Sequence, residues 1–479
     1  MKLYKLFIAC ALSICVSSCD DFLDVNPEGE KLEKELFKNA QGFEDAIYGV
    51  YGSLQQANLY GKDMLWGVTE VLAQNLDWSS YEGKDLSLYR YEESDDIRQR
   101  FAMMWNKSYE TLGWTNNILN QLQNWNEQSL PFYNYYKGEM LGIRAMLHFD
   151  LLRLFAPTDE SKQGIPYVKD YSFQVKPFYK VGEVYKMIID DLLEAEKLLA
   201  PEESKLSYPR TDNAYHNFEK FRYTHFNIYA VRALLARVYW TKGDMALAAK
   251  YAQNVIDSKC FPLVNPEEIE GYLAGTLSPK ETIFGVYSTS YHEMARDFLY
   301  EYISYRSYTA YEKTVKNIYQ MDVPENNQDF RFQTHFKGEQ GGIYKCLKLV
   351  DRYTLENNVS ENRKSLHTGV TLMHVSELYL IAAEALLESN PVKALEYFDE
   401  EIASRGLTKL SDRQMTLTKE MIYNEYRKEM FCEGQIWFNM KRLHKNIVNS
   451  NNGNTIPASD KVYVLPIPEE EFEFRNENN

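Results

Sequence analysis

Apolar residues recur at spacings of three and four along most of the chain from about residue 40 onward, which is typical of amphipathic helices. The first such run is made by Phe43, Ile47, Val50, Tyr51 and Leu54. The same pattern predicts helices over 101–125, 139–155 and 184–199. The segment 139–155 is apolar almost all round, so we expect it to be buried on several faces.

Two segments carry the pattern of a tetratricopeptide (TPR) hairpin. In 226–258, two predicted helices are joined by Lys242-Gly243-Asp244, and glycine suits the turn. A weaker version of the pattern lies at 376–404. Because one such hairpin cannot bury its own apolar face, several must stack. We therefore predict a mostly α fold, a TPR-like helical-hairpin superhelix of about four hairpins.

Residues 259–370 interrupt the helical pattern with prolines and glycines, and short strand-like runs such as 282–287 replace long helices. We predict an irregular, loop-rich inserted subdomain that binds ligand. The mature chain would then divide into 19–258, 259–370 and 371–479. The run 462–467 predicts a short strand or an extended tail.

Residues 1–18 have the layout of a cleavable lipoprotein signal peptide. Two lysines precede an apolar run over 6–16, which is too short to span a bilayer. Cys19 follows small residues that suit a signal peptidase, whereas Cys10 has too little chain before it and Cys15 follows a bulky isoleucine. We expect cleavage before Cys19 and lipidation of its thiol. The alternative is an ordinary secreted protein in which Cys19 is buried.

The net charge of -16 becomes -18 once residues 1–18 and their two lysines are removed. Such an acidic chain disfavours nucleic acid as a partner. The remaining cysteines, Cys260, Cys346 and Cys432, are odd in number and widely spaced, which favours buried free thiols over a disulfide framework. Beyond the lipid anchor, we expect no contact of the chain with the membrane interior.

Enzyme motifs with a recognisable spacing are absent from the sequence. Glu92-Glu93 and Asp95-Asp96 are interpreted as a solvated loop. A pair of glycosidase carboxylates needs closeness in space and not in sequence, so a cryptic glycosidase or peptidase remains an alternative. Our prediction is a protein that is not an enzyme and uses no cofactor, metal ion or catalytic residue.

Aromatic residues are abundant, with 37 tyrosines and seven tryptophans. Five tryptophans lie in predicted helices and are expected in the core: Trp105, Trp114, Trp125, Trp240 and Trp437. Trp78 has polar neighbours and no helical period, so we expect an exposed indole. Exposed rings beside amides and carboxylates suit the C–H face of a pyranose, and they also suit peptides. The candidate ligand-binding residues are Asn75, Asp77, Trp78, Tyr81, Tyr89, Tyr91, Tyr287, Tyr291, His292, Tyr305 and Tyr308. A fully packed, tyrosine-rich insertion is the competing interpretation for each of them.

Several motifs resemble the SusD/RagB family of nutrient-binding lipoproteins of Bacteroidetes. Residues 19–27 (CDDFLDVNP) resemble the start of the mature family proteins, residues 427–434 (RKEMFCEG) their most diagnostic motif, and residues 465–468 (LPIP) their C-terminal signature. The resemblance implies a lipid-anchored protein on the outer surface of the outer membrane. It would capture oligosaccharides or peptides and deliver them to a SusC-like TonB-dependent β-barrel transporter. Family ligand residues lie in variable loops, so none carries over by motif.

The diagnostic motif also has a physical interpretation. Glu425, Glu429 and Glu433 repeat at intervals of four, and like charges so placed need cations. The candidate cations are Arg427, Lys428 and Arg442. The motif is therefore predicted to be structural.

The leading hypothesis is a non-catalytic glycan-binding lipoprotein for polysaccharide utilisation. Oligopeptide capture is the alternative within the same class of protein, and backbone hydrogen bonds would then dominate recognition. A TPR-type adaptor that binds only other proteins is a further alternative.

Overall fold

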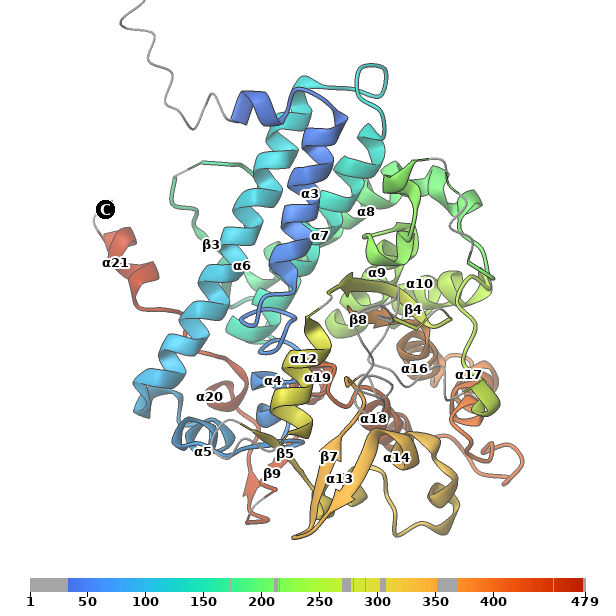
Figure 1. The fold of residues 1–479 in the computed structure, drawn as a ribbon. Coiled ribbons are helices and arrows are strands. Elements are labelled where there is room, and N and C mark those ends of the chain that lie inside the picture. The colour runs from blue at the N-terminus through green and yellow to red at the C-terminus, as the bar shows by residue number, and fades with distance from the viewer. Residues whose placement is uncertain are drawn as a thin grey trace, which may run out of the picture.

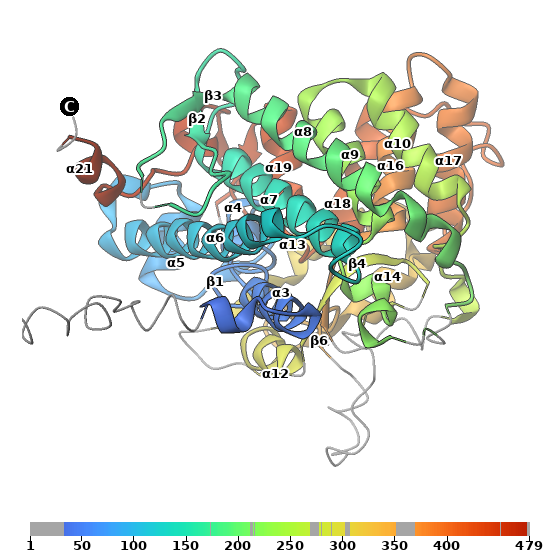
Figure 2. The same cartoon turned by 90° about the horizontal axis from the view of Figure 1, so that it is seen from above.

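Helices dominate the computed structural model of the chain (Figure 1). The structure describes residues 33–172, 174–210, 214, 216–268, 277–278, 280–288, 290–301, 307–350, 369–450 and 452–476. Eight helices pack in series, each against the next: α3 (Ala40–Leu54), α6 (Asp95–Gln121), α7 (Tyr133–Phe155), α8 (Val181–Leu199), α9 (Ile228–Lys242), α10 (Met245–Asp257), α16 (Val375–Leu386) and α17 (Pro391–Ser404). Seen from above, α6 and α17 lie towards opposite ends of this series (Figure 2). The predicted mostly α, TPR-like fold is confirmed.

The hairpin predicted at 226–258 is formed by α9 and α10. Gly243 ends α9 with a φ of +90°, a left-handed conformation that glycine adopts without steric cost. The Asp244 side chain then accepts a hydrogen bond from the amide of Leu247 and caps α10. The weaker pattern at 376–404 corresponds to α16 and α17.

Helix α7 is buried from Tyr136 to Phe155 except for Lys137, as its apolar pattern predicted. Its charged side chains are buried with partners. Arg144 donates to both carboxylate oxygens of Asp191 on α8 at 2.7 Å, and Glu139 accepts from Tyr51 and Arg222 at 2.6 Å. These pairs fix α7 against three neighbouring segments.

Two predictions for residues of α6 are wrong. Asp95 and Asp96 are not in a loop but form the first turn of α6, which the Ser94 side chain caps. Carboxylates favour this position because the helix dipole is positive there. The predicted core residue Trp114 is 42% exposed on α6, with the Lys107 ammonium 4.8 Å from its ring.

Short strands bring distant segments together. A four-stranded antiparallel sheet has the order β1 (Asp77–Trp78), β5 (Tyr308–Tyr311), β7 (Ile343–Cys346) and β6 (Phe336–Glu339). Strand β4 (Thr282–Tyr287), at the predicted position, pairs with β8 (Gly369–His374). Between these strands lie α12 (Tyr291–Ala295), the π turn Arg296–Tyr300, α13 (Glu312–Ile318) and α14 (Phe330–His335). Because β1 comes from the N-terminal part, the sheet joins that part to residues 307–346.

The remaining elements are short. They are α4 (Val68–Leu72), α5 (Tyr81–Ser87), the pairs β2 (Gln163–Pro166) with β3 (Phe178–Lys180) and β9 (Ile447–Val448) with β10 (Thr455–Ile456), α18 (Lys419–Glu429), α19 (Gln435–Arg442), α20 (Asp460–Tyr463) and α21 (Glu470–Asn476). The prediction for 462–467 is wrong at its start, because residues 462 and 463 end α20. Cys260, Cys346 and Cys432 are buried free thiols, as predicted.

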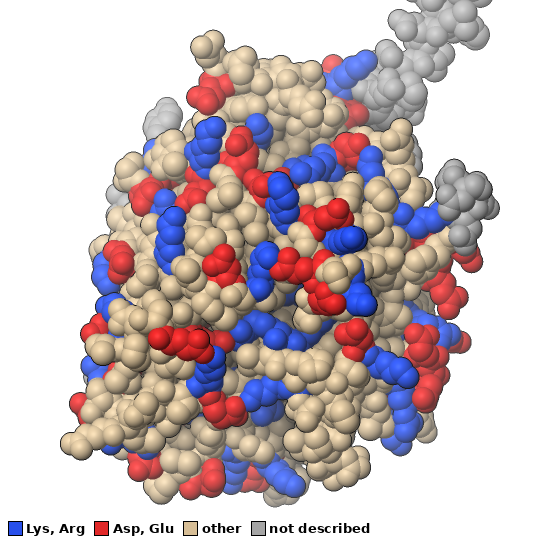
Figure 3. All heavy atoms as spheres, turned by 180° about the vertical axis from the view of Figure 1, so that it is seen from behind, with Lys and Arg blue, Asp and Glu red and all other residues tan. Residues whose placement is uncertain are grey.

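The surface carries both signs of charge. On the face shown in Figure 3, acidic and basic side chains are interspersed. Within the described ranges, no helix combines the length and the apolar character that crossing a membrane requires.

A buried network of ion pairs joins the strands around β4 and β8 to the C-terminal helices. Arg405, which follows α17, donates to both oxygens of Glu281 at 2.9 and 3.0 Å and to Glu429 of α18 at 2.7 and 2.9 Å. Arg331 of α14 donates to Asp329 and to Glu429, each at 2.7 Å. These side chains are at most 2% exposed. Each of these carboxylates is therefore buried and accepts hydrogen bonds from a guanidinium group in place of water.

The cations of this network differ in part from those predicted. Lys428 does pair with Glu425, at 3.1 Å. Arg427 and Arg442 do not contribute, because Arg427 donates to Asn75 and Arg442 pairs with Glu384. Arg331, Arg405, Lys348 and His374 provide the remaining positive charge. They come from parts of the sequence far from the motif.

The positive and negative charges of this network are equal in number if one carboxyl group is neutral. Burial, together with Glu425 and Glu429, raises the pKa of Glu401 well above its ordinary value, which favours the neutral form of this carboxyl group. Among the described residues, the cations Arg331, Arg405, Lys348, Lys428 and His374 then face the carboxylates Asp329, Glu281, Glu425, Glu429 and Glu433. Burial alone lowers the pKa of His374, but Glu433 and Glu429 raise it above its ordinary value.

Replacement of Arg405 by alanine is expected to destabilise the protein by about 3–5 kcal/mol, because Glu281 and Glu429 would lose their shared cation. Urea unfolding followed by circular dichroism measures this change. Lys419→Ala is the control: Lys419 pairs with Glu388 on the surface and is 64% exposed, so its loss should change stability by less than about 1 kcal/mol. Equal stability losses in the two variants would contradict a central role of Arg405.

Substitution of Glu401 by glutamine is expected to raise stability relative to the wild type, and more so at about pH 8 than at about pH 5. A pKa that is higher in the folded than in the unfolded state favours folding at low pH. This contribution to stability is lost as the pH rises above the pKa of the unfolded state, about 4.3. The Glu401→Gln variant does not lose stability in this way, because its side chain is neutral at every pH.

Urea unfolding of both proteins across this pH range tests the expectation for Glu401. Glu110→Gln provides the matched control, since the Glu110 carboxylate is 49% exposed and, within the described part of the chain, forms its ion pair with Lys107. A difference in unfolding free energy between wild type and Glu401→Gln that is constant with pH would contradict a raised pKa of the buried Glu401 carboxyl group.

Candidate functional site

Trp78 lies beneath the surface, so the prediction of an exposed indole is wrong. Its side chain is only 8% exposed and stacks on Tyr308 of β5, with ring centroids 5.4 Å apart and an angle of 11°. The Arg100 guanidinium lies 4.6 Å from the Trp78 ring. Helix α5 closes over the same segment, since a Cβ atom on Gly83 would lie 2.2 Å from the Trp78 carbonyl oxygen. Trp78 is thus part of a support for α5.

Tyr81 is the exposed ring of this region. It is the first residue of α5 and is 91% exposed, the highest value among the large apolar side chains that the structure describes. Ser80 caps the helix by accepting a hydrogen bond from the Gly83 amide at 2.8 Å. The backbone that carries Tyr81 is therefore fixed, and the ring projects into solvent.

Arg100 fixes α5 from the side and was missed by the sequence analysis. It donates to Glu82 of α5 and pairs with Asp63 at 3.2 Å. Burial lowers the pKa of Arg100, but the Glu82 and Asp63 carboxylates outweigh it and raise the pKa above the ordinary value. The predicted helix began at residue 101, so even the helical position of Arg100, five residues after the start of α6, was not predicted. Its partners lie on other segments.

Three further candidates in the Trp78 region have structural partners. Asn75 is buried; its amide donates to Glu70 at 2.9 Å, and its carbonyl oxygen accepts from Arg427 at 3.1 Å. Tyr89 donates to the Leu72 carbonyl at 2.6 Å, and the buried Tyr91 donates to the Val462 carbonyl at 2.7 Å. Asp77 is half-buried in β1, opposite Thr309.

The candidate residues after residue 280 include buried rings and one exposed ring. Tyr291 and Tyr308 are buried, at 1% and 3% exposure, so neither presents its ring to solvent. Tyr287 at the end of β4 is 49% exposed and stays a candidate. Tyr305 and Cys19 lie outside the described residues, and so does the side chain of His292.

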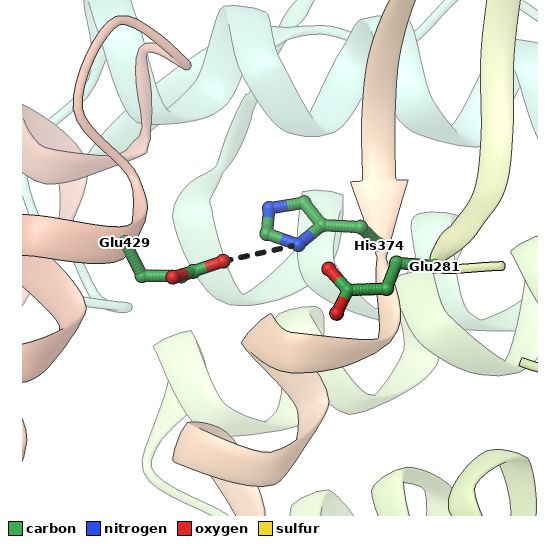
Figure 4. A group of neighbouring side chains, drawn as sticks. All are labelled: Glu281, His374 and Glu429. Atoms are coloured by element: carbon green, nitrogen blue, oxygen red, sulfur yellow. Dashed lines mark ion pairs between the residues drawn. The ribbon is translucent and has the colours of Figure 1, made fainter. Parts of the chain in front are cut away.

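Glu281, His374 and Glu429 are the described side chains whose potential metal ligands come within 4.8 Å of one another (Figure 4). His374 ends β8, Glu281 precedes β4 and Glu429 ends α18. Both carboxylates already accept from Arg405. The His374 Nε2 lies 2.7 Å from Glu433, its Nδ1 lies against the Ser376 hydroxyl, and its raised pKa disfavours the neutral ring that a metal ion needs. The group fits an ion-pair network and not a metal centre.

Known proteins resemble the chain along almost its whole length. Residues 21–240 match a family model described as "Starch-binding associating with outer membrane", and residues 280–475 match the model of the SusD family. "SusD-like protein P2" of Formosa agariphila is 24% identical over 100% of this chain and 98% of its own. A SusD-like protein of Bacteroides ovatus is 20% identical over 91% of this chain and 82% of its own.

Solved structures share the fold. A SusD superfamily protein of Bacteroides thetaiotaomicron superposes with a TM-score of 0.74 at 20% identity, covering 91% of this chain and 98% of the other. A structure titled "Laminarin binding SusD-like protein" has a TM-score of 0.67 at 18% identity, with coverage of 91% and 98%. With both family models matched in order along one chain that has this fold, the protein belongs to the SusD/RagB family.

Proposed function

We propose that the protein is a non-catalytic, lipid-anchored glycan-binding protein of the cell surface that delivers its ligand to a TonB-dependent outer-membrane transporter. Membership of the SusD/RagB family supports the class of function. The observation that carries the site is Tyr81, a solvent-facing ring on a backbone held by the packed Trp78 and Arg100 side chains.

A tyrosine ring in this setting suits a sugar chain. Its flat apolar face covers the C–H face of a pyranose, while its hydroxyl stays in water. Because α5 is held by Ser80, Glu82 and the close contact at Gly83, the backbone that carries the ring needs little ordering when ligand binds. A single exposed ring on a convex helix end favours an extended chain over a small molecule that requires enclosure.

The net charge of -16 favours a neutral glycan. A polyanionic polysaccharide would meet long-range repulsion from the acidic protein. One structure with the same fold is named for laminarin binding, so laminarin is the first probe, beside starch and a neutral xylan. The proposed division of the chain is that residues 19–258 provide the Tyr81 site and the inserted residues 259–370 support it through β5.

Replacement of Tyr81 by alanine is expected to weaken binding of the cognate neutral glycan by about tenfold, the effect of losing about 1.4 kcal/mol of ring contact. Its exposure of 91% means that the melting temperature should stay unchanged. Isothermal titration calorimetry and affinity electrophoresis measure the two proteins against laminarin, starch and xylan.

Tyr171→Ala is the matched control for this variant, because Tyr171 is also exposed, at 51%, but lies between β2 and β3. It should bind glycan like the wild type. Unchanged affinity in Tyr81→Ala would reject the Tyr81 site. Binding of oligopeptides by a protein that ignores every glycan in the panel would instead support peptide capture.

Replacement of Cys19 by alanine in cells is expected to abolish incorporation of an alkyne-labelled fatty acid and to release the protein from the membrane fraction, since the acyl chains are the proposed anchor. Cys15→Ala should leave both readouts unchanged. Labelling that survives in Cys19→Ala and disappears in Cys15→Ala would place the lipid anchor on Cys15 and contradict the proposal.

A further inference from the structure

A second, enclosed candidate site lies far from Tyr81. A cavity of about 350 Å³ opens where α7, the 3-10 turns η3 (Ala200–Lys205) and η5 (Arg222–Thr224) and the start of α9 meet. Figures 1 and 2 place this green part of the chain well away from α5. The volume is at the lower end of the range for ligand pockets, about 300–1,000 Å³, so it suits one or two sugar rings.

Aromatic rings form much of the cavity wall. They come from Tyr135, Phe221, Tyr223 and Phe261. The Arg210 guanidinium lies 4.4 Å from the Tyr223 ring, and the Arg222 guanidinium lies 4.9 Å from the Tyr135 ring. Phe221 is 37% exposed and reaches the rim, whereas Tyr223 is buried at 5%. The cavity therefore combines apolar faces with fixed polar groups, as sugar sites do.

Arg222 presents a buried donor that lacks an acceptor. The side chain is 6% exposed, and its Nη1 donates to Glu139 at 2.6 Å while its Nε donates to Glu202. Its Nη2 has no hydrogen-bond partner among the described residues. A buried guanidinium donor is costly to leave unpaired. The Nη2 atom is itself closed off from solvent, so a small turn of the Arg222 side chain towards the cavity would bring it to a ligand hydroxyl oxygen.

The charges that line the cavity are already paired. Lys205 bonds Glu219 at 2.7 Å, and Arg222 is shared between Glu202 and Glu139. Arg210 donates to the carbonyl oxygens of Lys280 and Thr282. Glu219 offsets Lys205, and Glu202 with Glu139 offsets Arg222, so a ligand with its own negative charge would meet the Glu202 and Glu219 carboxylates beside cations that are already in ion pairs. The cavity thus favours a neutral ligand with hydroxyl groups.

We propose that this cavity is a second binding site, which takes a single neutral sugar unit. A sugar hydroxyl accepts from the Arg222 Nη2, and the pyranose ring packs against Tyr135 and Phe221. The inference rests on the proposed function for the class of ligand. The residues that line this cavity are different from those of the Tyr81 site.

Binding of D-glucose, the neutral sugar of laminarin, to the full mature chain provides the test, with D-glucuronate as the charged counterpart. Ligand-observed NMR titration measures both. The variants are Tyr135→Leu and Phe221→Leu, which remove cavity rings and keep Arg222 with its buried partners Glu139 and Glu202. Each should bind glucose about two- to tenfold more weakly than the wild type. Thermal melting checks that both variants fold.

Tyr81→Ala is the control that separates the two sites. It should bind glucose like the wild type while losing affinity for the polysaccharide. Glucose binding that persists unchanged in both cavity variants would overturn the second site, and so would tighter binding of glucuronate than of glucose. Wild-type protein that binds laminarin but no glucose would overturn the second site alone. A wild type that binds neither glucose nor laminarin, starch or xylan would overturn both the site and the proposed function.

Discussion

The shared contact of Arg405 with Glu281 and Glu429 is the interaction on which the arrangement of the molecule depends. It joins the entrance to β4, the end of α17 and the end of α18, all of them away from water. Buried charges are tolerated only when they are matched, so these segments must meet in one geometry. Hydrophobic burial alone would let the short strands settle in several ways against the helices. The ion pairs instead specify a single arrangement, at the cost of removing ten charges from water.

The segment 427–434 reaches the proposed Tyr81 site through Asn75. Arg427 on α18 donates to the Asn75 carbonyl oxygen, and the Asn75 amide donates to Glu70, which also accepts from the Gly434 backbone at 3.2 Å. Burial raises the pKa of Glu70 to about 7. Strand β1 begins two residues after Asn75. The motif that marks the family therefore sets where Trp78 and α5 lie, which gives a structural reason for its charged residues.

Local pattern predicted much of the fold, and pairing over long sequence distances explains what it missed. The α9–α10 hairpin was visible from its periodicity and its turn glycine, and the β4 strand from its short strand-like run, because these signals lie within each segment. The burial of Trp78 depends on Tyr308 and Arg100, which no local pattern connects to it. Tyr81 was among the predicted ligand residues, but the sequence gives no means of ranking it above Trp78. The cations Arg331 and Arg405 were missed for the same reason.

The burial of Trp78 makes Tyr81 a better binding residue than an exposed Trp78 would be. Any exposed ring that a ligand immobilises loses side-chain freedom, at a cost of about 0.5–1.5 kcal/mol, so the difference between the two positions lies in the backbone that carries the ring. In the structure, the Trp78 indole packs on Tyr308, and α5 covers it. Tyr81 then stands on a capped helix whose neighbour Glu82 is fixed by Arg100. The energy of a buried tryptophan thus contributes to recognition indirectly, by holding the exposed ring ready for its ligand.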